Sequence, residues 1–228
     1  MAADADLNAR PRLIVVGGPN GSGKTALTEQ ILRHRWLDGC EYVNPDNIAR
    51  DAFGDWNDSS ATLAAAQEAE RIREACLAEG RSLAFETVMS APDKLDFINR
   101  AKRAGFFVRL FFVSTTHPSI NAARVAMRVM AGGHEVPITK IVSRYSKSIA
   151  NCAAVIGDVD RGYIYDNSVD GAPAKLLFRV KNGSLAKLYE PELPAWAELI
   201  RGAIRVEADS NGPKSEHRVS PILNPPRG

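Results

Sequence analysis

Apolar residues along the chain fall into two kinds of pattern. Short runs of β-branched, aromatic and leucine residues alternate with longer segments whose apolar positions recur at helical spacing. The short runs are typical of strands buried on both faces of a parallel sheet, and their alternation with helices predicts an α/β fold. Strands are expected at residues 13–16, 41–44, 82–85, 106–113 and 163–167, and helices at 24–33, 60–79 and 92–104 and around 120–130 and 138–149.

The last two of these helical segments each carry an apolar stripe. The stripes consist of Ile120, Ala123, Met127 and Met130 in the first segment and of Ile138, Ile141, Val142, Tyr145 and Ile149 in the second. Residues 131–137 between them contain two glycines and a proline, which excludes one continuous helix. His134 lies in this break and is expected to be a turn residue rather than a catalyst.

The C-terminal part of the chain follows a different pattern. Residues 175–180 and 186–189 predict a β-hairpin, because the intervening Asn182-Gly183 favours a turn that matches the twist of paired strands. A last helix is expected at residues 194–206. Residues 207–228 contain four prolines and no aromatic residue, so we expect a disordered tail after a single domain that spans residues 1–206.

The composition fits one soluble globular domain. The chain has 228 residues, of which 45% are hydrophobic and 25% charged, enough to bury a substantial core. A formal net charge of +2 gives no support for binding to nucleic acid or to a membrane surface. The three cysteines form no close pair and are expected to be reduced. We see neither a signal peptide nor a membrane span and expect a cytoplasmic protein.

One motif carries strong chemical information. It lies between the first predicted strand and the first predicted helix and matches G-x-x-x-x-G-K-[ST] in full: Gly18, Pro19, Asn20, Gly21, Ser22, Gly23, Lys24 and Thr25. Because Gly21 and Gly23 lack side chains, the backbone N–H groups can surround phosphate oxygens, and the positive end of the following helix adds to the attraction. The motif predicts ATP as cofactor, with Lys24 at the β- and γ-phosphates and Thr25 as a ligand of Mg²⁺.

This motif narrows the fold class. We expect a P-loop NTPase-type parallel sheet flanked by helices, with a helical lid and a small C-terminal β-hairpin plus helix. In such open sheets ligands bind beyond the carboxyl ends of the strands. Side chains that follow the predicted strands are therefore the first candidates for contact with a phosphate acceptor.

Two acidic residues follow predicted strands. Asp46, after the second strand, is our candidate for the base that binds an acceptor hydroxyl and takes its proton, and its alternative role is to cap a helix that begins at Asn47. Glu86 and Thr87, after the third strand, are expected to hold the substrate or else to be a solvated strand end. Either acid could instead support Mg²⁺, because no predicted strand ends in an obvious Walker-B aspartate.

Basic residues at helical spacing lie on both sides of the break at residues 131–137. Arg124 and Arg128 share one helix face, and Lys140, Arg144 and Lys147 share another. Basic helices joined by glycines are typical of a lid, placed here at about residues 124–147, that stabilises the charge on a transferred phosphoryl group. We expect Arg128 and Arg144 to act in catalysis and Arg124 in substrate binding, and both lysines to be solvated. The alternative is that both helices present only a solvated basic surface.

Taken together, these segments resemble the zeta toxin family of P-loop kinases. Besides the phosphate-binding loop, the resemblance rests on Val43-Asn-Pro-Asp46, on Phe85-Glu-Thr87, on Arg124 to Arg144 with residues 132–137 inside, and on Tyr165-Asp-Asn167. It covers residues 13–167, about two thirds of the chain.

The resemblance has functional implications. Known members phosphorylate the 3′-hydroxyl of UDP-N-acetylglucosamine or related UDP-amino sugars. By resemblance, a UDP-amino sugar is the small-molecule substrate, Asp46 is the catalytic base, and Glu86 and Thr87 hold the sugar. The arginines that bound the lid contact the transferring phosphate, and an antitoxin protein is a candidate partner.

Two other interpretations stay open. The protein could be a kinase of another nucleotide or small hydroxyl compound, or an ATP-binding switch with no metabolic substrate. The switch interpretation predicts loops whose order depends on the presence of the γ-phosphate. Acidic residues opposite the phosphates favour a kinase, because a switch needs no acceptor pocket.

Overall fold

The computed structural model describes residues 10–53, 59–132 and 136–205. The tail expected at residues 207–228 and His134 lie outside the described residues. Within them, no helix has both the length and the apolar character needed to cross a lipid bilayer.

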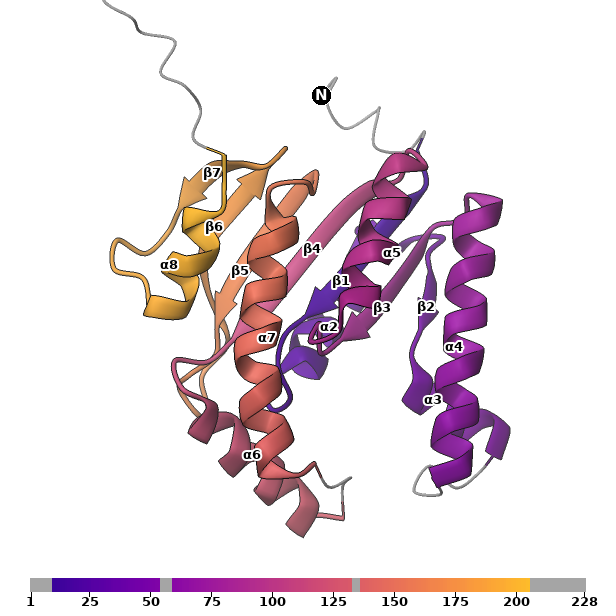
Figure 1. The fold of residues 1–228 in the computed structure, drawn as a ribbon, viewed down its shortest axis with the longest axis horizontal. Coiled ribbons are helices and arrows are strands. Elements are labelled where there is room, and N and C mark those ends of the chain that lie inside the picture. The colour runs from indigo at the N-terminus through magenta and orange to yellow at the C-terminus, as the bar shows by residue number, and fades with distance from the viewer. Residues whose placement is uncertain (1–9, 54–58, 133–135, 206–228) are drawn as a thin grey trace, which may run out of the picture.

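A mostly parallel sheet of seven strands forms the centre of the fold, in the order β2-β3-β1-β4-β5-β6-β7 (Figure 1). The first five strands of the chain pair in parallel, and the last two pair antiparallel. Because β1 lies between β3 and β4, the loop after β1 opens where the strand order reverses, which is the usual ligand position in such sheets. The strands are β1 (Arg12–Gly17), β2 (Glu41–Val43), β3 (Leu83–Thr87), β4 (Phe107–Ser114), β5 (Arg161–Asp166), β6 (Lys175–Lys181) and β7 (Ser184–Leu188).

Helices cover both faces of the sheet. Figure 1 shows α4, α5, α7 and α8 in front of the sheet and α2 behind it, whereas α6 and the first half of α7 project beyond the carboxyl ends of the parallel strands. The helices are α2 (Lys24–Leu32), α3 (Pro45–Phe53), α4 (Ser59–Glu79), α5 (Pro92–Arg103), α6 (Pro118–Met130), α7 (Ile138–Ile156) and α8 (Ala195–Gly202), and a short 3-10 turn, η2, spans Arg35–Leu37.

Alternate residues of β1 enter two separate cores. Leu13 and Val15 pack into the cluster that α5, α7 and α8 share, and Ile14 and Val16 pack with Leu27 of α2 on the other face. Side chains of a strand alternate between the faces of its sheet, so a strand covered on both faces must be apolar at every position. The uninterrupted apolar run in the sequence is thereby explained.

The observed strands agree with those predicted. All seven are present, and the turn between β6 and β7 contains Asn182 and Gly183 with positive φ angles of 51° and 80°. The hairpin does not stand apart, because β6 pairs with β5 and extends the main sheet. Among the helices, α3 was not predicted from the apolar pattern, and α7 continues past residue 149 to Ile156.

The expected apolar stripe of α6 does not face the core. Met127 and Met130 are 68% and 88% exposed, and the buried residues of this helix are Asn121 and Val125. This part of the stripe is exposed on a helix that lies beyond the ends of the parallel strands (Figure 1). Of the stripe predicted in α7, Ile141, Tyr145 and Ile149 are buried, whereas Ile138 and Val142 are exposed.

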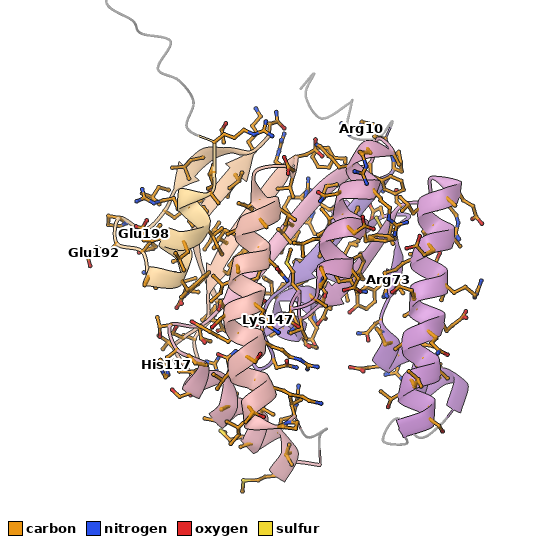
Figure 2. All side chains as sticks on the ribbon, viewed as in Figure 1. Arg10, Arg73, His117, Lys147, Glu192 and Glu198 are labelled. Carbon is orange, nitrogen blue, oxygen red and sulfur yellow. The ribbon has the colours of Figure 1, made fainter. Side chains whose placement is uncertain are left out.

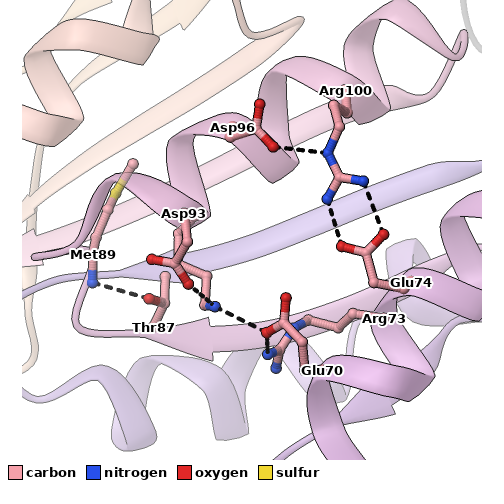
Figure 3. Close-up of polar contacts among 9 residues, drawn as sticks. Glu70, Arg73, Glu74, Thr87, Met89, Asp93, Asp96 and Arg100 are labelled. Carbon is pink, nitrogen blue, oxygen red and sulfur yellow. Dashed lines mark hydrogen bonds and ion pairs between the residues drawn. The ribbon is translucent and has the colours of Figure 1, made fainter. Parts of the chain in front are cut away.

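Charged side chains join α4 to α5 and to the sheet (Figure 3). Arg100 of α5 donates two hydrogen bonds to Glu74 of α4. Arg73, labelled in Figure 2, pairs with Glu70 of its own helix and lies over the ring of Phe85 in β3, 5.3 Å from its centroid. These contacts hold α4 beside β3, the strand that carries Glu86 and Thr87.

Candidate active site

The loop between β1 and α2 follows a path that requires glycine at two positions. Gly21 and Gly23 have φ angles of 76° and 92°, in the left-handed region that other residues rarely adopt. Neighbouring atoms also leave no room for a side chain. A Cβ atom on Gly21 would lie 2.5 Å from the carbonyl oxygen of Asn121, and one on Gly23 would lie 2.1 Å from Nδ2 of Asn167. The loop is thus packed tightly against α6 and the segment after β5.

Lys24 folds back onto this loop. Its Nζ donates hydrogen bonds to the carbonyl oxygens of Gly18 and Pro19, each at 2.9 Å. Burial of the ammonium group lowers the pKa of Lys24 to about 8; the negative charge of Glu86 opposes this shift, and the positive charge of Arg128 adds to it. Lys24 therefore lies within electrostatic reach of one predicted acid and one predicted lid arginine.

Two features beside the loop fit a nucleotide and its metal ion. A pocket of about 270 Å³ adjoins the start of α2, and its lining includes Gly23, Gln30, Arg124, Asn167 and Pro173. A pocket next to a phosphate-binding loop can take the base and ribose of a nucleotide. The Thr25 hydroxyl, exposed in the first turn of α2, has no hydrogen-bond partner within the described residues, and it is a suitable oxygen ligand for Mg²⁺.

Asp46 occupies the first turn of α3 but does not cap it. The cap is Asn44, whose Oδ1 accepts a hydrogen bond from the backbone N–H of Asp46 at 2.8 Å, while its carbonyl oxygen accepts one from Ile48. The Asp46 carboxylate is exposed and has no hydrogen-bond partner within the described residues; its charge adds slightly to the burial that raises the pKa of Tyr42. It is free to meet an acceptor hydroxyl.

Glu86 is fixed by a tyrosine that the sequence analysis did not identify. The Tyr42 hydroxyl donates to Oε1 of Glu86 at 3.1 Å and accepts a hydrogen bond from Nδ2 of Asn44 at 3.0 Å. Burial of the phenol and the adjacent carboxylate raise the pKa of Tyr42, which therefore remains a donor. Asn44 thus contributes to both acids, because it caps the helix of Asp46 and holds the tyrosine that contacts Glu86.

Thr87 has a structural contact at the end of β3. Its Oγ1 accepts a hydrogen bond from the backbone N–H of Met89 at 2.9 Å (Figure 3). Met89 is fully buried and has a φ angle of 58°, which is unfavourable for a residue with a side chain. The Thr87 hydroxyl still has its own proton to donate, so this turn contact does not prevent contact with a substrate.

The three arginines assigned to the expected lid have different surroundings. Arg144 of α7 lies with one guanidinium nitrogen 3.4 Å from Oδ1 of Asn20 in the loop. Arg128 of α6 is exposed, and its charge adds to the burial that lowers the pKa of Lys24. Arg124 pairs with Asp170 and donates to the carbonyl oxygen of Asn167 at 2.7 Å, in the wall of the pocket beside α2. Lys140 and Lys147 are exposed, as the sequence predicts.

The candidate residues converge on the edge where the parallel strands end. The loop follows β1, Asp46 follows β2, Glu86 and Thr87 end β3, and the arginines come from α6 and α7 beyond that edge. Tyr42 and Asn121 were not identified from the sequence. Neither the short strand that contains Tyr42 nor the helical segment that contains Asn121 indicates in the sequence what these side chains contact.

Comparisons with known proteins agree with this architecture. The family model described as zeta toxin matches residues 2–170. An uncharacterized protein of Haemophilus influenzae is 28% identical over 129 residues, which cover 56% of this chain and 88% of that protein. A crystal structure of AvrRxo1-ORF1:-ORF2 with ATP superposes with a TM-score of 0.63 and 18% identity, over 88% of this chain and 66% of that one.

A second solved structure has a similar fold. It comes from the PezAT chromosomal toxin-antitoxin system of Streptococcus pneumoniae and superposes with a TM-score of 0.55 and 15% identity, over 92% of this chain and 88% of that one. Structural likeness at such low identity shows the fold, which is of the α/β P-loop type. Since the family model covers residues 2–170, well over half of the chain, the protein belongs to the zeta toxin family.

Proposed function

We propose that this protein transfers the γ-phosphate of ATP to a hydroxyl group of a UDP-amino sugar such as UDP-N-acetylglucosamine. Membership of the zeta toxin family supports an ATP-dependent kinase. One observation carries the proposal further: two carboxylates, Glu86 and Asp46, stand at the same sheet edge as Lys24, and the described residues give Asp46 no hydrogen-bond partner. An ATP-binding switch would need no such group beside its phosphates.

The proposed reaction assigns a role to each carboxylate. Glu86, held by Tyr42, binds and orients acceptor hydroxyls, and Thr87 assists. Asp46 accepts the proton of the attacking hydroxyl. The bond between the acceptor oxygen and the γ-phosphorus forms as the bond to the β,γ-bridging oxygen breaks, and ADP leaves.

Positively charged side chains stabilise the negative charge that develops on the phosphoryl group during transfer. Lys24 exchanges the carbonyl oxygens of Gly18 and Pro19 for phosphate oxygens, and Arg128 and Arg144 approach from α6 and α7. Mg²⁺, held at Thr25, would neutralise phosphate charge when bound. Arg124, beside the pocket at α2, is positioned to contact the nucleotide or the substrate.

A protein partner is part of the proposal. The similar structure from Streptococcus pneumoniae belongs to a toxin-antitoxin system. By that likeness we include an antitoxin protein as a partner of this chain, in addition to the small-molecule substrate.

The acceptor can be identified directly. Purified protein is incubated with ATP, Mg²⁺ and one acceptor at a time, namely UDP-N-acetylglucosamine, other UDP-sugars, nucleosides and dinucleotides, and the products are weighed by mass spectrometry. The proposal expects a gain of one phosphate on the UDP-amino sugar. If only another compound gains a phosphate, the proposed substrate is wrong and the kinase assignment stands. If no acceptor gains a phosphate, the kinase assignment is contradicted.

A further inference from the structure

Two asparagine side chains from distant parts of the chain bind carbonyl oxygens of the phosphate-binding loop. Nδ2 of Asn121, on α6, donates to the carbonyl oxygen of Asn20 at 2.6 Å. Nδ2 of Asn167, just after β5, donates to the carbonyl oxygen of Ser22 at 2.9 Å. Neither asparagine belongs to the G-x-x-x-x-G-K-[ST] motif, and they lie about 100 and 145 residues from the carbonyls they bind.

Because each bound carbonyl group belongs to a peptide bond, each contact also fixes the direction of the N–H group of the next residue in the loop. In a trans peptide the C=O of one residue and the N–H of the next point in opposite directions, and the described residues contain no cis peptide. A carbonyl of Asn20 held toward α6 therefore directs the N–H of Gly21 away from α6. A carbonyl of Ser22 held toward Asn167 directs the N–H of Gly23 away from the segment after β5 in the same way.

Those two N–H groups are unused by the protein. Within the described residues, neither the N–H of Gly21 nor that of Gly23 has a hydrogen-bond acceptor, whereas the N–H of Ser22 between them donates to the carbonyl oxygen of Pro19. Donors that point the same way around a tight turn form an anion-binding hollow. Without the two asparagines, these peptide units could rotate and present their carbonyl oxygens to the phosphates instead.

Each asparagine is itself held in place. Asn121 is fully buried, and its Oδ1 accepts a hydrogen bond from the Thr115 hydroxyl. The backbone N–H of Asn167 donates to Ser114 at 2.8 Å, and its carbonyl oxygen accepts from Arg124 at 2.7 Å. Asn121 is held at both atoms of its amide, and Asn167 is held at its backbone N–H and carbonyl oxygen, so both asparagines are positioned against the loop before any nucleotide binds.

We propose that Asn121 and Asn167 are positioning residues, which aim the N–H groups of Gly21 and Gly23 at the phosphates of the nucleotide. The inference rests on the proposed function insofar as ATP is the phosphate donor, and it does not depend on the acceptor. It also gives a second reason for glycine at both positions, because a Cβ atom there would strike the asparagine that orients the loop.

The test measures binding of inorganic tripolyphosphate and of ATP by calorimetry, with no acceptor present. Asn121→Ala and Asn167→Ala are each expected to raise both dissociation constants about 5- to 10-fold, the scale of one hydrogen bond. Asn151→Ala is the matched control. Its Nδ2 donates to the carbonyl oxygen of Met89 at 2.8 Å, so it loses the same kind of bond away from the loop and should bind tripolyphosphate like the wild type.

A second measurement observes the N–H groups of Gly21 and Gly23 directly. In protein labelled with ¹⁵N-glycine, tripolyphosphate should shift the amide signals of Gly21 and Gly23 in the wild type and in Asn151→Ala, and shift them less in the two loop variants. If Asn121→Ala does not fold, the comparison of Asn167→Ala with Asn151→Ala decides alone. Unchanged affinity and unchanged shifts in Asn167→Ala would overturn the inference. A wild type that binds tripolyphosphate but phosphorylates no UDP-sugar would contradict the proposed substrate and leave this inference standing.

Discussion

The side-chain oxygen of Asn44 accepts a hydrogen bond from the backbone N–H of Asp46 at 2.8 Å. Because Asn44 caps α3, the Asp46 carboxylate is not needed as a cap and remains available to accept a proton from the acceptor hydroxyl. Asp46→Asn should lower turnover by about 10²- to 10⁴-fold, because the amide cannot take a proton. Affinity for ATP and the free energy of unfolding should stay close to wild type.

The matched variant is Asn44→Ala, which removes the cap. It should lower the free energy of unfolding by about 1 kcal/mol, as measured by urea denaturation. The opposite outcome, in which Asp46→Asn loses stability and keeps its turnover, would show that Asp46 has a structural role only.

Tyr42 should act on the acceptor through Glu86. Tyr42→Phe keeps the ring and removes the hydroxyl that donates to Glu86. We expect the KM for the acceptor to rise about 10- to 100-fold, the scale of one hydrogen bond to a carboxylate, while the KM for ATP is unchanged. In a Glu86→Gln background the same substitution should raise the KM for the acceptor much less, since the effects of substituting two residues in contact are not additive.

Tyr163→Phe provides the control for this experiment. It removes a hydroxyl from a buried tyrosine of the sheet, one with no hydrogen bond from that hydroxyl within the described residues. If Tyr42→Phe raises the KM for the acceptor equally in the wild-type and Glu86→Gln backgrounds, Tyr42 does not act through Glu86.

The lid arginines should matter in the transition state. Arg128→Ala and Arg144→Ala are each expected to lower kcat by about 10²-fold or more, because they meet charge that develops during transfer. Steady-state kinetics should show a smaller effect on acceptor binding. Lys140→Ala and Lys147→Ala, exposed on the same lid, should have little effect. If the lysines cost as much as the arginines, the basic faces attract polyanions in general and the catalytic assignment fails.

Lys24 predicts a pH dependence of nucleotide binding. In the free protein its pKa is about 8, and phosphate oxygens favour the charged form and so raise this pKa on binding. ATP affinity should therefore be constant below about pH 8 and fall as the pH rises above it, with uptake of a proton on binding. Calorimetry in buffers of different ionisation enthalpy measures that uptake. Lys24→Met should show no such step, and a wild type without proton uptake above about pH 8 would contradict the assignment.

The sequence predicted more of the fold than of the site. Strand β1 was predictable because burial on both faces demands an uninterrupted apolar run, and the phosphate-binding loop because its chemistry requires specific residues. The exposed stripe of α6 was not predictable, since periodicity identifies an apolar face without showing whether anything covers it. Asn121 and Tyr42 could not be assigned, because their contacts depend on which elements the fold brings together.

The central claim is that the loop at Lys24 supports phosphoryl transfer from ATP. The most direct test follows the γ-phosphate of isotopically labelled ATP into the acceptor identified by mass spectrometry, with wild type and Lys24→Ala compared at equal concentration and equal folded fraction. We expect labelled acceptor with the wild type and none above background with Lys24→Ala, whose circular dichroism and melting temperature remain near wild type. Normal transfer by a folded Lys24→Ala protein would contradict this claim.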